Sequence, residues 1–358
     1  MRFLLGMAVS LAGVVVSVRA CASHTDASNF TIAMVRTYPP NWPLPLLSSN
    51  WTGITMNISQ AVDKAVDLIQ EASHENASLV LFPELWFPGY PMGFGDDTNW
   101  PTVLLPEYIE NCLTVGDGNW ARIVDSVVDT GVYVGLGFCD KTTENIFMGQ
   151  ALISPSGDVL IHRHKLRPSG SERDMFSDGT MEMLEVTTTR YGRIGMLECY
   201  EHFWPSMTLP MQAQLENIHL AAFPYLVDDS NPQKQWYEGT FVNMAAETHY
   251  AVLSGAYVFH TSVGTSWVIS PSGEVLTHVG STVDMDTTPI VYYGVNTTGF
   301  DTTATYDVNG EVSWGVVKQI YDGFPSYIPK DPGTFVDFAS IPIALEQSGN
   351  YNGTPPAS

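Results

Sequence analysis

Basic residues are scarce in this chain of 358 residues, where 15 Lys and Arg are set against 38 Asp and Glu. The formal net charge is therefore −23 at pH 7. Nucleic acid and anionic membranes repel so acidic a surface, and we expect neither as a partner. The charge suits a protein that stays in solution under mildly acidic conditions.

Cysteine is sparse as well, and its four positions are Cys21, Cys112, Cys139 and Cys199. Four cysteines are too few to form a disulfide scaffold in a chain this long. Cys112 and Cys139 either pair with each other or stay buried as thiols. Cys199 is then left over as an odd thiol, which favours a chemical role for it in an oxidising compartment.

Long apolar runs are limited to one, residues 3–18, which follows Arg2 and precedes the small residue Ala20. This pattern predicts a secretory signal peptide over residues 1–20. A transmembrane anchor is the alternative, but the run is short for one. The polar C-terminus carries no lipid-anchor signal, so we expect a secreted, extracellular protein with no membrane partner.

Asn-x-Ser/Thr sequons are more frequent than chance predicts from the Asn, Ser and Thr content of this chain. Together with the signal peptide they predict passage through a glycosylating pathway. The candidate glycosylation sites are Asn29, Asn50, Asn57, Asn76, Asn296 and Asn352.

Apolar periodicity predicts alternating strands and helices along the chain. In the first half we expect strands at 31–37, 79–82 and 132–138, helices at 58–72, 108–112 and 120–128, and a hairpin at 147–161. In the second half we expect strands at 194–197, 218–222 and 251–258, helices at 205–215 and near 241–248, and another hairpin. The same order of elements therefore occurs twice.

Two sequence matches support an internal repeat. Ile153-Ser-Pro-Ser-Gly-Asp-Val-Leu-Ile-His162 recurs as Ile269-Ser-Pro-Ser-Gly-Glu-Val-Leu-Thr-His278, and Phe82-Pro-Glu-Leu85 recurs as Phe223-Pro-Tyr-Leu226. Pro-Ser-Gly is common turn chemistry, so two unrelated turns are the alternative explanation. Because further elements agree in order, we predict an α/β fold of two pseudo-symmetric halves. Their sheets pack face to face in a four-layer αββα sandwich.

Cys199 lies where the apolar strand 194–197 gives way to polar residues, shortly before Pro205, which is suited to open a helix. Helix amides near this junction favour a thiolate, which is the form that acts as a nucleophile. The alternative is that Cys199 is a small buried hydrophobic residue, as most free cysteines are.

Two other polar segments follow predicted strands. Glu84 comes directly after the strand 79–82 among apolar neighbours, where desolvation raises a carboxyl pKa and makes a general base. Its alternative role is to cap backbone amides. Lys165 lies in the basic segment 161–173, and an ammonium group there stabilises a thiolate, a carboxylate or negative charge on a substrate. The alternative for this segment is a solvated loop.

Taken together and in this order, the three segments resemble the nitrilase superfamily of carbon–nitrogen hydrolases. Glu84 lies in a Phe-Pro-Glu-x-x-x-Pro-Gly-Tyr-Pro pattern, Lys165 opens Lys-Leu-Arg-Pro-Ser-Gly-Ser-Glu-Arg, and Cys199 opens Cys-Tyr-Glu-His. The resemblance covers roughly residues 30–300, and the superfamily fold is the four-layer sandwich that the repeat predicts. It implies a carbon–nitrogen hydrolase domain over residues 26–320. Pro, Gly, Ser and Asn accumulate beyond it, so we expect a partly disordered tail at 321–358.

The resemblance implies that Glu84, Lys165 and Cys199 form a catalytic triad, with Glu172 as a second glutamate that orients the lysine or a water. Cys199 would attack a nitrile carbon and pass through a thioimidate and a thioester to a carboxylic acid and ammonia. No cofactor and no metal are expected, and a homo-oligomer is. Candidate walls of the substrate pocket, each with core packing as the alternative, are Trp86, Tyr200, His202 and Trp204.

The motifs Pro-Gly-Tyr-Pro and Cys-Tyr-Glu-His resemble those of the nitrile-cleaving branch of the superfamily. With the export signal, they imply a secreted, fungal-type member of that branch. An amidase acting on small amides and a hydratase that stops at the amide remain alternatives, so the expected partner is a small nitrile or amide. There are departures from the pattern: Arg163-His164 precedes the lysine where His-Arg is usual, and the Pro/Trp-rich loop 39–51 is inserted.

Two readings from other classes also remain. Cys199 and His202 with His162 or His164 would form a metal site, although a single Cys-x-x-His pair matches zinc spacing poorly. A secreted binding protein without activity is disfavoured because Glu84, Lys165 and Cys199 are all present.

Overall fold

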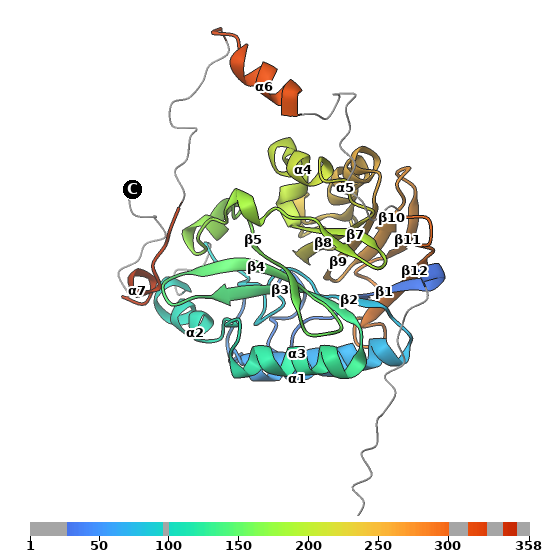
Figure 1. Ribbon diagram of the computed structural model, residues 1–358. Helices are drawn as coiled ribbons and strands as arrows, with labels where there is room; N and C mark the ends of the chain where they lie inside the picture. Colours follow the sequence, from blue (N-terminus) through green and yellow to red (C-terminus); the bar gives the residue numbers. More distant parts are fainter. Residues whose placement is uncertain (1–26, 96–99, 301–313, 328–338, 349–358) are drawn as a thin grey trace, which may run out of the picture.

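The computed structural model describes residues 27–95, 100–300, 314–327 and 339–348. Two six-stranded sheets lie face to face, and helices cover the outer side of each (Figure 1). The predicted α/β four-layer sandwich is confirmed. None of the helices in the described ranges is long and apolar enough to span a membrane. The predicted signal peptide at 1–20 and the sequon at Asn352 lie outside these ranges.

The first sheet has the strand order β12-β1-β2-β3-β4-β5, with β1, β2 and β3 parallel and the other pairs antiparallel. Its strands are β1 (Phe30–Val35), β2 (Leu79–Leu81), β3 (Tyr133–Lys141), β4 (Ile146–Ile153), β5 (Val159–His164) and β12 (Ile290–Val295). The helical elements of this half are η1 (Ala27–Asn29), α1 (Ile58–His74), η2 (Trp100–Leu104), α2 (Leu105–Glu110), α3 (Gly118–Thr130) and η3 (Gly170–Asp174).

The second sheet has the order β11-β10-β9-β8-β7-β6 and again has three parallel strands, β7, β8 and β9. Its strands are β6 (Thr187–Thr189), β7 (Gly192–Glu198), β8 (Ile218–Tyr225), β9 (Tyr257–Val263), β10 (Ser266–Ile269) and β11 (Val275–Val279). The other helical elements are η4 (Met181–Met183), η5 (Cys199–Phe203), α4 (Pro205–Gln212), η6 (Trp236–Glu238), α5 (Thr240–Ser254), α6 (Trp314–Asp322) and α7 (Ile343–Glu346).

Burial on both faces of the sheets divides the core into layers. Along β1, Ile32 and Met34 point into the cluster between the sheets, whereas Ala33 and Val35 point into the cluster under α1. Successive side chains of a strand face opposite ways, so an unbroken apolar strand serves two layers. Met196 and Leu220 of the second sheet complete the layer between the sheets.

The two sequence-matched hairpins have the same local structure. The serine that opens each turn accepts a hydrogen bond from the next glycine: Gly157 N to Ser154 O is 2.8 Å, and Gly273 N to Ser270 O is 2.9 Å. Both glycines are left-handed, with φ of +85° and +84°. Each packs on a helix of its own half, α3 for Gly157 and α5 for Gly273. The turn sequence therefore recurs because the same hairpin-on-helix contact is built twice.

The predicted strand at 251–258 is wrong at its start. Residues 251–254 form the last turn of α5, and β9 begins only at Tyr257. Gly255 ends the helix in the left-handed conformation at φ +68°, and its amide bonds back to Ala251 O. Of the apolar residues before this glycine, Ala251 is buried whereas Val252 and Leu253 are exposed, so hydrophobicity alone did not separate helix from strand.

Part of the predicted C-terminal tail packs on the body of the protein. Ile341 is fully buried, and its amide donates to Ser177 Oγ at 2.8 Å. Asn145 Nδ2 donates to Ile341 O at 2.9 Å. Residues 339–348 thus form an ordered contact, while residues 328–338 and 349–358 of the predicted tail lie outside the described residues.

Truncating one side chain of the layer between the sheets tests this packing. Leu220→Ala should lower the free energy of unfolding by about 2–5 kcal/mol, because it leaves a cavity at a fully buried site. Leu253→Ala, on the exposed side of α5, is the matched control and should change it by less than about 0.5 kcal/mol. Urea unfolding measures both, and equal effects would contradict the burial described.

Candidate active site

Glu84 is held between the two sheets by its backbone. It follows β2 and Pro83, and its amide donates to Phe223 O of β8 at 3.1 Å. On the other side, a Cβ at Gly137 of β3 would lie 2.3 Å from Pro83 O and 2.7 Å from Glu84 Cα. Only glycine permits this approach of β3 to the glutamate.

Lys165 lies between two glutamates. Its Nζ donates to Glu84 Oε1 at 3.1 Å and to Glu172 Oε2 at 2.9 Å. Glu172 is held in turn by the Tyr90 hydroxyl, which donates to Oε1 at 3.0 Å, and by the Ser169 amide, which donates to Oε2 at 2.6 Å. Glu84 and Lys165 are fully buried. A buried ammonium needs such paired carboxylates, since an isolated one is too costly to desolvate.

Cys199 follows Glu198, the last residue of β7, and starts η5, with a left-handed φ of +41° that is uncommon for a residue with a side chain. This turn brings the thiol to a cavity that Glu172 also lines. Burial raises the pKa of the Cys199 thiol well above its usual range, and the Glu84 carboxylate raises it further. Lys165 and the Tyr200 amide lower the pKa of the thiol, but by less than burial and Glu84 raise it.

Nearby amides are expected to favour a thiolate, and the Tyr200 amide does lower the pKa of Cys199, but burial outweighs it. Burial raises the pKa of the Glu84 carboxyl well above its usual range, with Lys165 opposing and Glu198 and Glu172 adding to the rise. Glu84 Oε1 bonds Lys165, whereas Oε2 has no hydrogen-bond partner among the described residues.

Glu201 joins the segments that carry Lys165 and Cys199. Its Oε1 accepts from Arg163 Nη2 at 2.6 Å and from the Leu166 amide at 2.9 Å. Its Oε2 accepts from the Glu198 amide at 2.8 Å. One buried carboxylate thus binds residues on either side of Lys165 and the residue before Cys199. We did not single out Glu201 from the sequence, although it is the glutamate of Cys-Tyr-Glu-His.

His202 supports the backbone of Cys199. Its Nδ1 lies 2.8 Å from Cys199 O, and its Nε2 lies 2.9 Å from Nε2 of His219. Burial lowers the pKa of the His202 imidazole well below its usual range, so the ring is neutral. Because a carbonyl only accepts, His202 donates from Nδ1 and must accept at Nε2.

The next hydrogen bonds in this chain are assigned in the same way, by matching each donor to an acceptor. His219 donates to His202 from Nε2, and its Nδ1 lies 2.7 Å from Glu216 Oε2. Glu216 Oε1 accepts from the Tyr250 hydroxyl at 2.9 Å. Glu216 therefore holds the His219 ring in place, and the Nε2–H of His219 sets the tautomer of His202.

The candidate pocket walls have different positions. Tyr200 lines the cavity beside Cys199. Trp86 is fully buried in the core, where its Nε1 donates to Thr37 O at 2.8 Å, and His202 is turned to His219. Trp204 is half exposed and packs edge-on against Tyr200. Trp86 and His202 are therefore not pocket walls, because the polar atoms of each form hydrogen bonds inside the protein.

The cavity has a volume of about 340 Å³. Sequence reasoning missed most of its walls, because they come from four separate segments: the loop after β2, the segment after β5 that includes η3, the end of β8, and η6. The residues that line it, besides Cys199 and Tyr200, are Tyr90, Ser169, Gly170, Ser171, Glu172, Pro224, Tyr225, Leu226, Tyr237 and Glu238. A neighbouring cavity shares several of these residues and is also lined by Leu47 and Ser49 of the inserted Pro/Trp-rich loop.

The suggested Cys199–His202 metal site is not formed. His202 is bonded to Cys199 O and His219, whereas His162 and His164 both contact Asp140. Among the described residues, the one cluster with metal-ligand spacing is Asp140, His162 and His164.

The support of Cys199 by His202 can be tested with two substitutions. His202→Leu should lower the rate constant for alkylation of Cys199 about 10- to 100-fold, because the loss leaves a buried carbonyl unpaired next to the thiol. His202→Asn keeps a donor and an acceptor and should stay within several-fold of wild type. The rate constant for alkylation is measured with iodoacetamide across a range of pH. The melting temperature of each variant is the control for folding. Equal rates for the two variants would contradict the role.

Comparison with known proteins identifies relatives over most of the chain. The model of the family described as "Carbon-nitrogen hydrolase" matches residues 35–291. An arylacetonitrilase of Aspergillus oryzae is 34% identical over 244 residues, which are 65% of this chain and 70% of the relative. A cyanide hydratase of Neurospora crassa is 35% identical over 170 residues, covering 47% and 48% of the two chains.

Solved structures show the same fold. An amidase from Nesterenkonia sp. superposes with a TM-score of 0.55 over 75% of this chain and 90% of that chain, at 20% sequence identity. The buried glutamate–lysine–glutamate cluster beside a cysteine therefore lies in a fold shared with an enzyme. This chain belongs to the carbon-nitrogen hydrolase family.

Proposed function

We propose that this protein hydrolyses nitriles to carboxylic acids and ammonia, with Cys199 as nucleophile, Glu84 as general base and Lys165 as the stabilising cation. The observation that carries the proposal is the Lys165 ammonium between Glu84 and Glu172 next to the Cys199 thiol. Relatives named arylacetonitrilase support the nitrile as substrate. The chain covers 66% of one of them, a little under two thirds of its length.

The first step joins the substrate to the enzyme. Glu84 Oε2 takes the proton of the Cys199 thiol as the sulfur attacks the nitrile carbon, and one C–N π bond becomes a lone pair on nitrogen. Lys165 stabilises this negative charge, and the proton that Glu84 took from the thiol passes to the nitrogen, which gives a thioimidate and restores the Glu84 carboxylate. Burial by itself lowers the pKa of the Lys165 amine, but the carboxylates of Glu172 and Glu84 outweigh it and raise that pKa well above its usual range. The cation is thus present at neutral pH.

Two waters complete the reaction. Glu84 takes a proton from the first as it adds to the thioimidate carbon, and the C–N bond breaks to release ammonia and leave a thioester. The second water hydrolyses the thioester, which releases the carboxylic acid and restores the thiol. Glu172 holds Lys165 in place throughout by its 2.9 Å contact.

Tyrosines dominate the cavity, which favours nitriles with an aromatic group. Tyr90, Tyr200, Tyr225 and Tyr237 line it together with Leu226. Aromatic side chains bind a planar ring by edge-to-face and offset contacts. An amidase or a hydratase with the same site is the second candidate, supported by the amidase fold neighbour and the relative named cyanide hydratase.

Removing the nucleophile tests the proposal directly. Cys199→Ala should lower kcat for phenylacetonitrile by at least about 10⁴-fold, because no other group supplies the sulfur. Ammonia release by wild type and variant measures the effect, and mass spectrometry of the product separates acid from amide. Full activity in Cys199→Ala would refute the mechanism. Release of ammonia from phenylacetamide alone would identify an amidase.

The raised pKa of Glu84 predicts an acidic limb in the pH profile. The base must be ionised to act, so kcat/KM should rise with pH, and the limb should lie above the usual glutamate pKa of about 4.3. Because the pKa of Lys165 is raised well above its usual range, Lys165 stays charged and causes no decrease of kcat/KM at neutral pH. Rates measured from about pH 4 to 9, with melting curves at each pH as control, test this. A limb at the usual glutamate value would contradict it.

We also propose that the protein is a secreted glycoprotein of the nitrilase branch and a homo-oligomer. Cys112 and Cys139 form a disulfide, which is typical of exported proteins. Of the described sequons, Asn29, Asn50, Asn76 and Asn296 are exposed and Asn57 is half-buried. The oligomer is supported by the family resemblance alone. Glycosidase treatment of the secreted protein and light scattering test these two points.

A further inference from the structure

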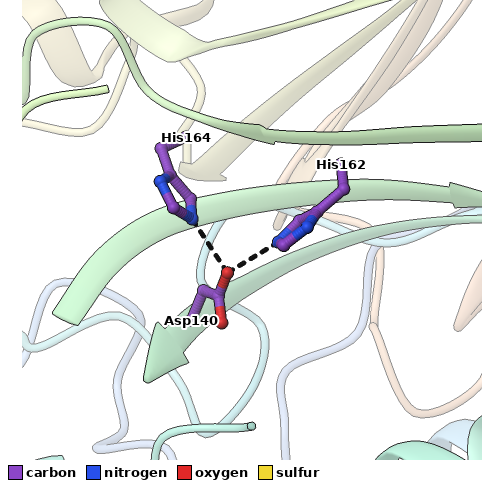
Figure 2. Close-up of side chains that lie close together, drawn as sticks. All are labelled: Asp140, His162 and His164. Atoms are coloured by element: carbon purple, nitrogen blue, oxygen red, sulfur yellow. Dashed lines mark hydrogen bonds and ion pairs between the residues drawn. The ribbon is translucent and has the colours of Figure 1, made fainter. Parts of the chain in front are cut away.

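Asp140, His162 and His164 converge on one point at the outer side of the first sheet (Figure 2). Nε2 of His162 lies 2.7 Å from Asp140 Oδ2, and Nε2 of His164 lies 2.8 Å from the same oxygen. The three ligand atoms lie within 4.8 Å of one another. Both imidazoles therefore aim the same nitrogen at one carboxylate oxygen.

The sheet builds this cluster across three strands. Asp140 is on β3 and the histidines are on β5, and β4 between them carries Gly149 opposite His164. A Cβ at Gly149 would lie 2.9 Å from Asp140 Cβ, so glycine leaves the space through which the aspartate reaches β5. The Phe147 ring stacks on His164 at a centroid distance of 3.9 Å and fixes its plane.

Solvent reaches the cluster from one side. The His162 side chain is 36% exposed, whereas the side chains of His164 and Asp140 are 8% and 3% exposed. Two ligands are thus fixed by the protein core, and the third is free to adjust by a rotamer change. Ligand distances of about 2.0–2.2 Å to a tetrahedral ion require nitrogen–oxygen separations of about 3.3 Å. Each histidine Nε2 must therefore move away from the carboxylate oxygen by roughly 0.5 Å.

We propose that Asp140, His162 and His164 bind a divalent transition-metal ion, Zn²⁺ in the first instance, with water as the fourth ligand. Two imidazole nitrogens and one carboxylate oxygen are the donor set that zinc binds well. Mg²⁺ and Ca²⁺ prefer sites made of oxygen ligands, so this set selects against them. The net charge of −23 raises the concentration of cations near the surface.

The metal site is present in only one half of the repeat. His162 corresponds to His278 in the second hairpin, so the residue that corresponds to His164 is Gly280, two positions further on in each case. The solvent-exposed His162 thus has a counterpart in the second hairpin, but His164, on the same face of the strand, has none. His278 is therefore a matched control: it is an exposed histidine in the same local structure without a second imidazole.

The site is separate from the catalytic groups. Side chains alternate along β5, so Arg163 reaches Glu201 and Lys165 reaches Glu84 on the face opposite His162 and His164. A metal ion would join β3 to the end of β5, one residue before Lys165. Its expected effect is on stability, by linking a strand that also carries the Cys112–Cys139 disulfide to the edge strand.

The test uses the full secreted chain without a histidine tag, first treated with a chelator and then dialysed against Zn²⁺. Metal analysis should show one Zn²⁺ per chain for wild type and His278→Ala, and less than about 0.1 for His162→Ala and His164→Ala. Saturating Zn²⁺ should raise Tm by about 5 °C in the first pair only, and Mg²⁺ should not raise it. Co²⁺ should give the visible absorption of a four-coordinate ion in wild type and not in His162→Ala.

His162 is at the surface, so His162→Ala should fold even if His164→Ala does not. Failure of wild type to bind Zn²⁺ would overturn the proposal, as would equal Zn²⁺ binding in His162→Ala and His278→Ala. These measurements do not depend on nitrile hydrolysis, so the metal site and the proposed function succeed or fail separately.

Discussion

The fully buried ammonium of Lys165 is the constraint on which the rest of this structure depends. A charge removed from water is tolerated only if opposite charges contact it closely, and here Glu84 and Glu172 do so at 3.1 and 2.9 Å. These three residues come from separate turns that follow β2 and β5. Both strands belong to the first sheet, and Glu201 links their cluster to the second sheet by bonding Arg163, Leu166 and Glu198.

The same burial determines the chemistry. It raises the pKa values of the Glu84 carboxyl and the Cys199 thiol together, the two groups that we propose as base and nucleophile. His202 and its neighbour His219 support the backbone of the left-handed Cys199.

Most of the fold was predictable from the sequence, because local patterns carry it. The repeated Ile-Ser-Pro-Ser-Gly hairpins, the amphipathic α1 and the apolar strands each record their own environment in their residues. The error occurred where such signals end: residues 251–254 continue α5 although the first three of them are apolar. Composition also did not specify that residues 339–348 pack on the body.

For the site, the sequence by itself singled out Glu84, Lys165 and Cys199 as candidates, because polar residues follow predicted strands there, and the family resemblance added Glu172. Only the tertiary structure decided their surroundings. It placed Trp86 and His202 in the interior, gathered tyrosines from distant loops around the cavity, and brought Asp140 to two histidines across β4. Such contacts join residues far apart in the chain, and no local periodicity records which of them will meet.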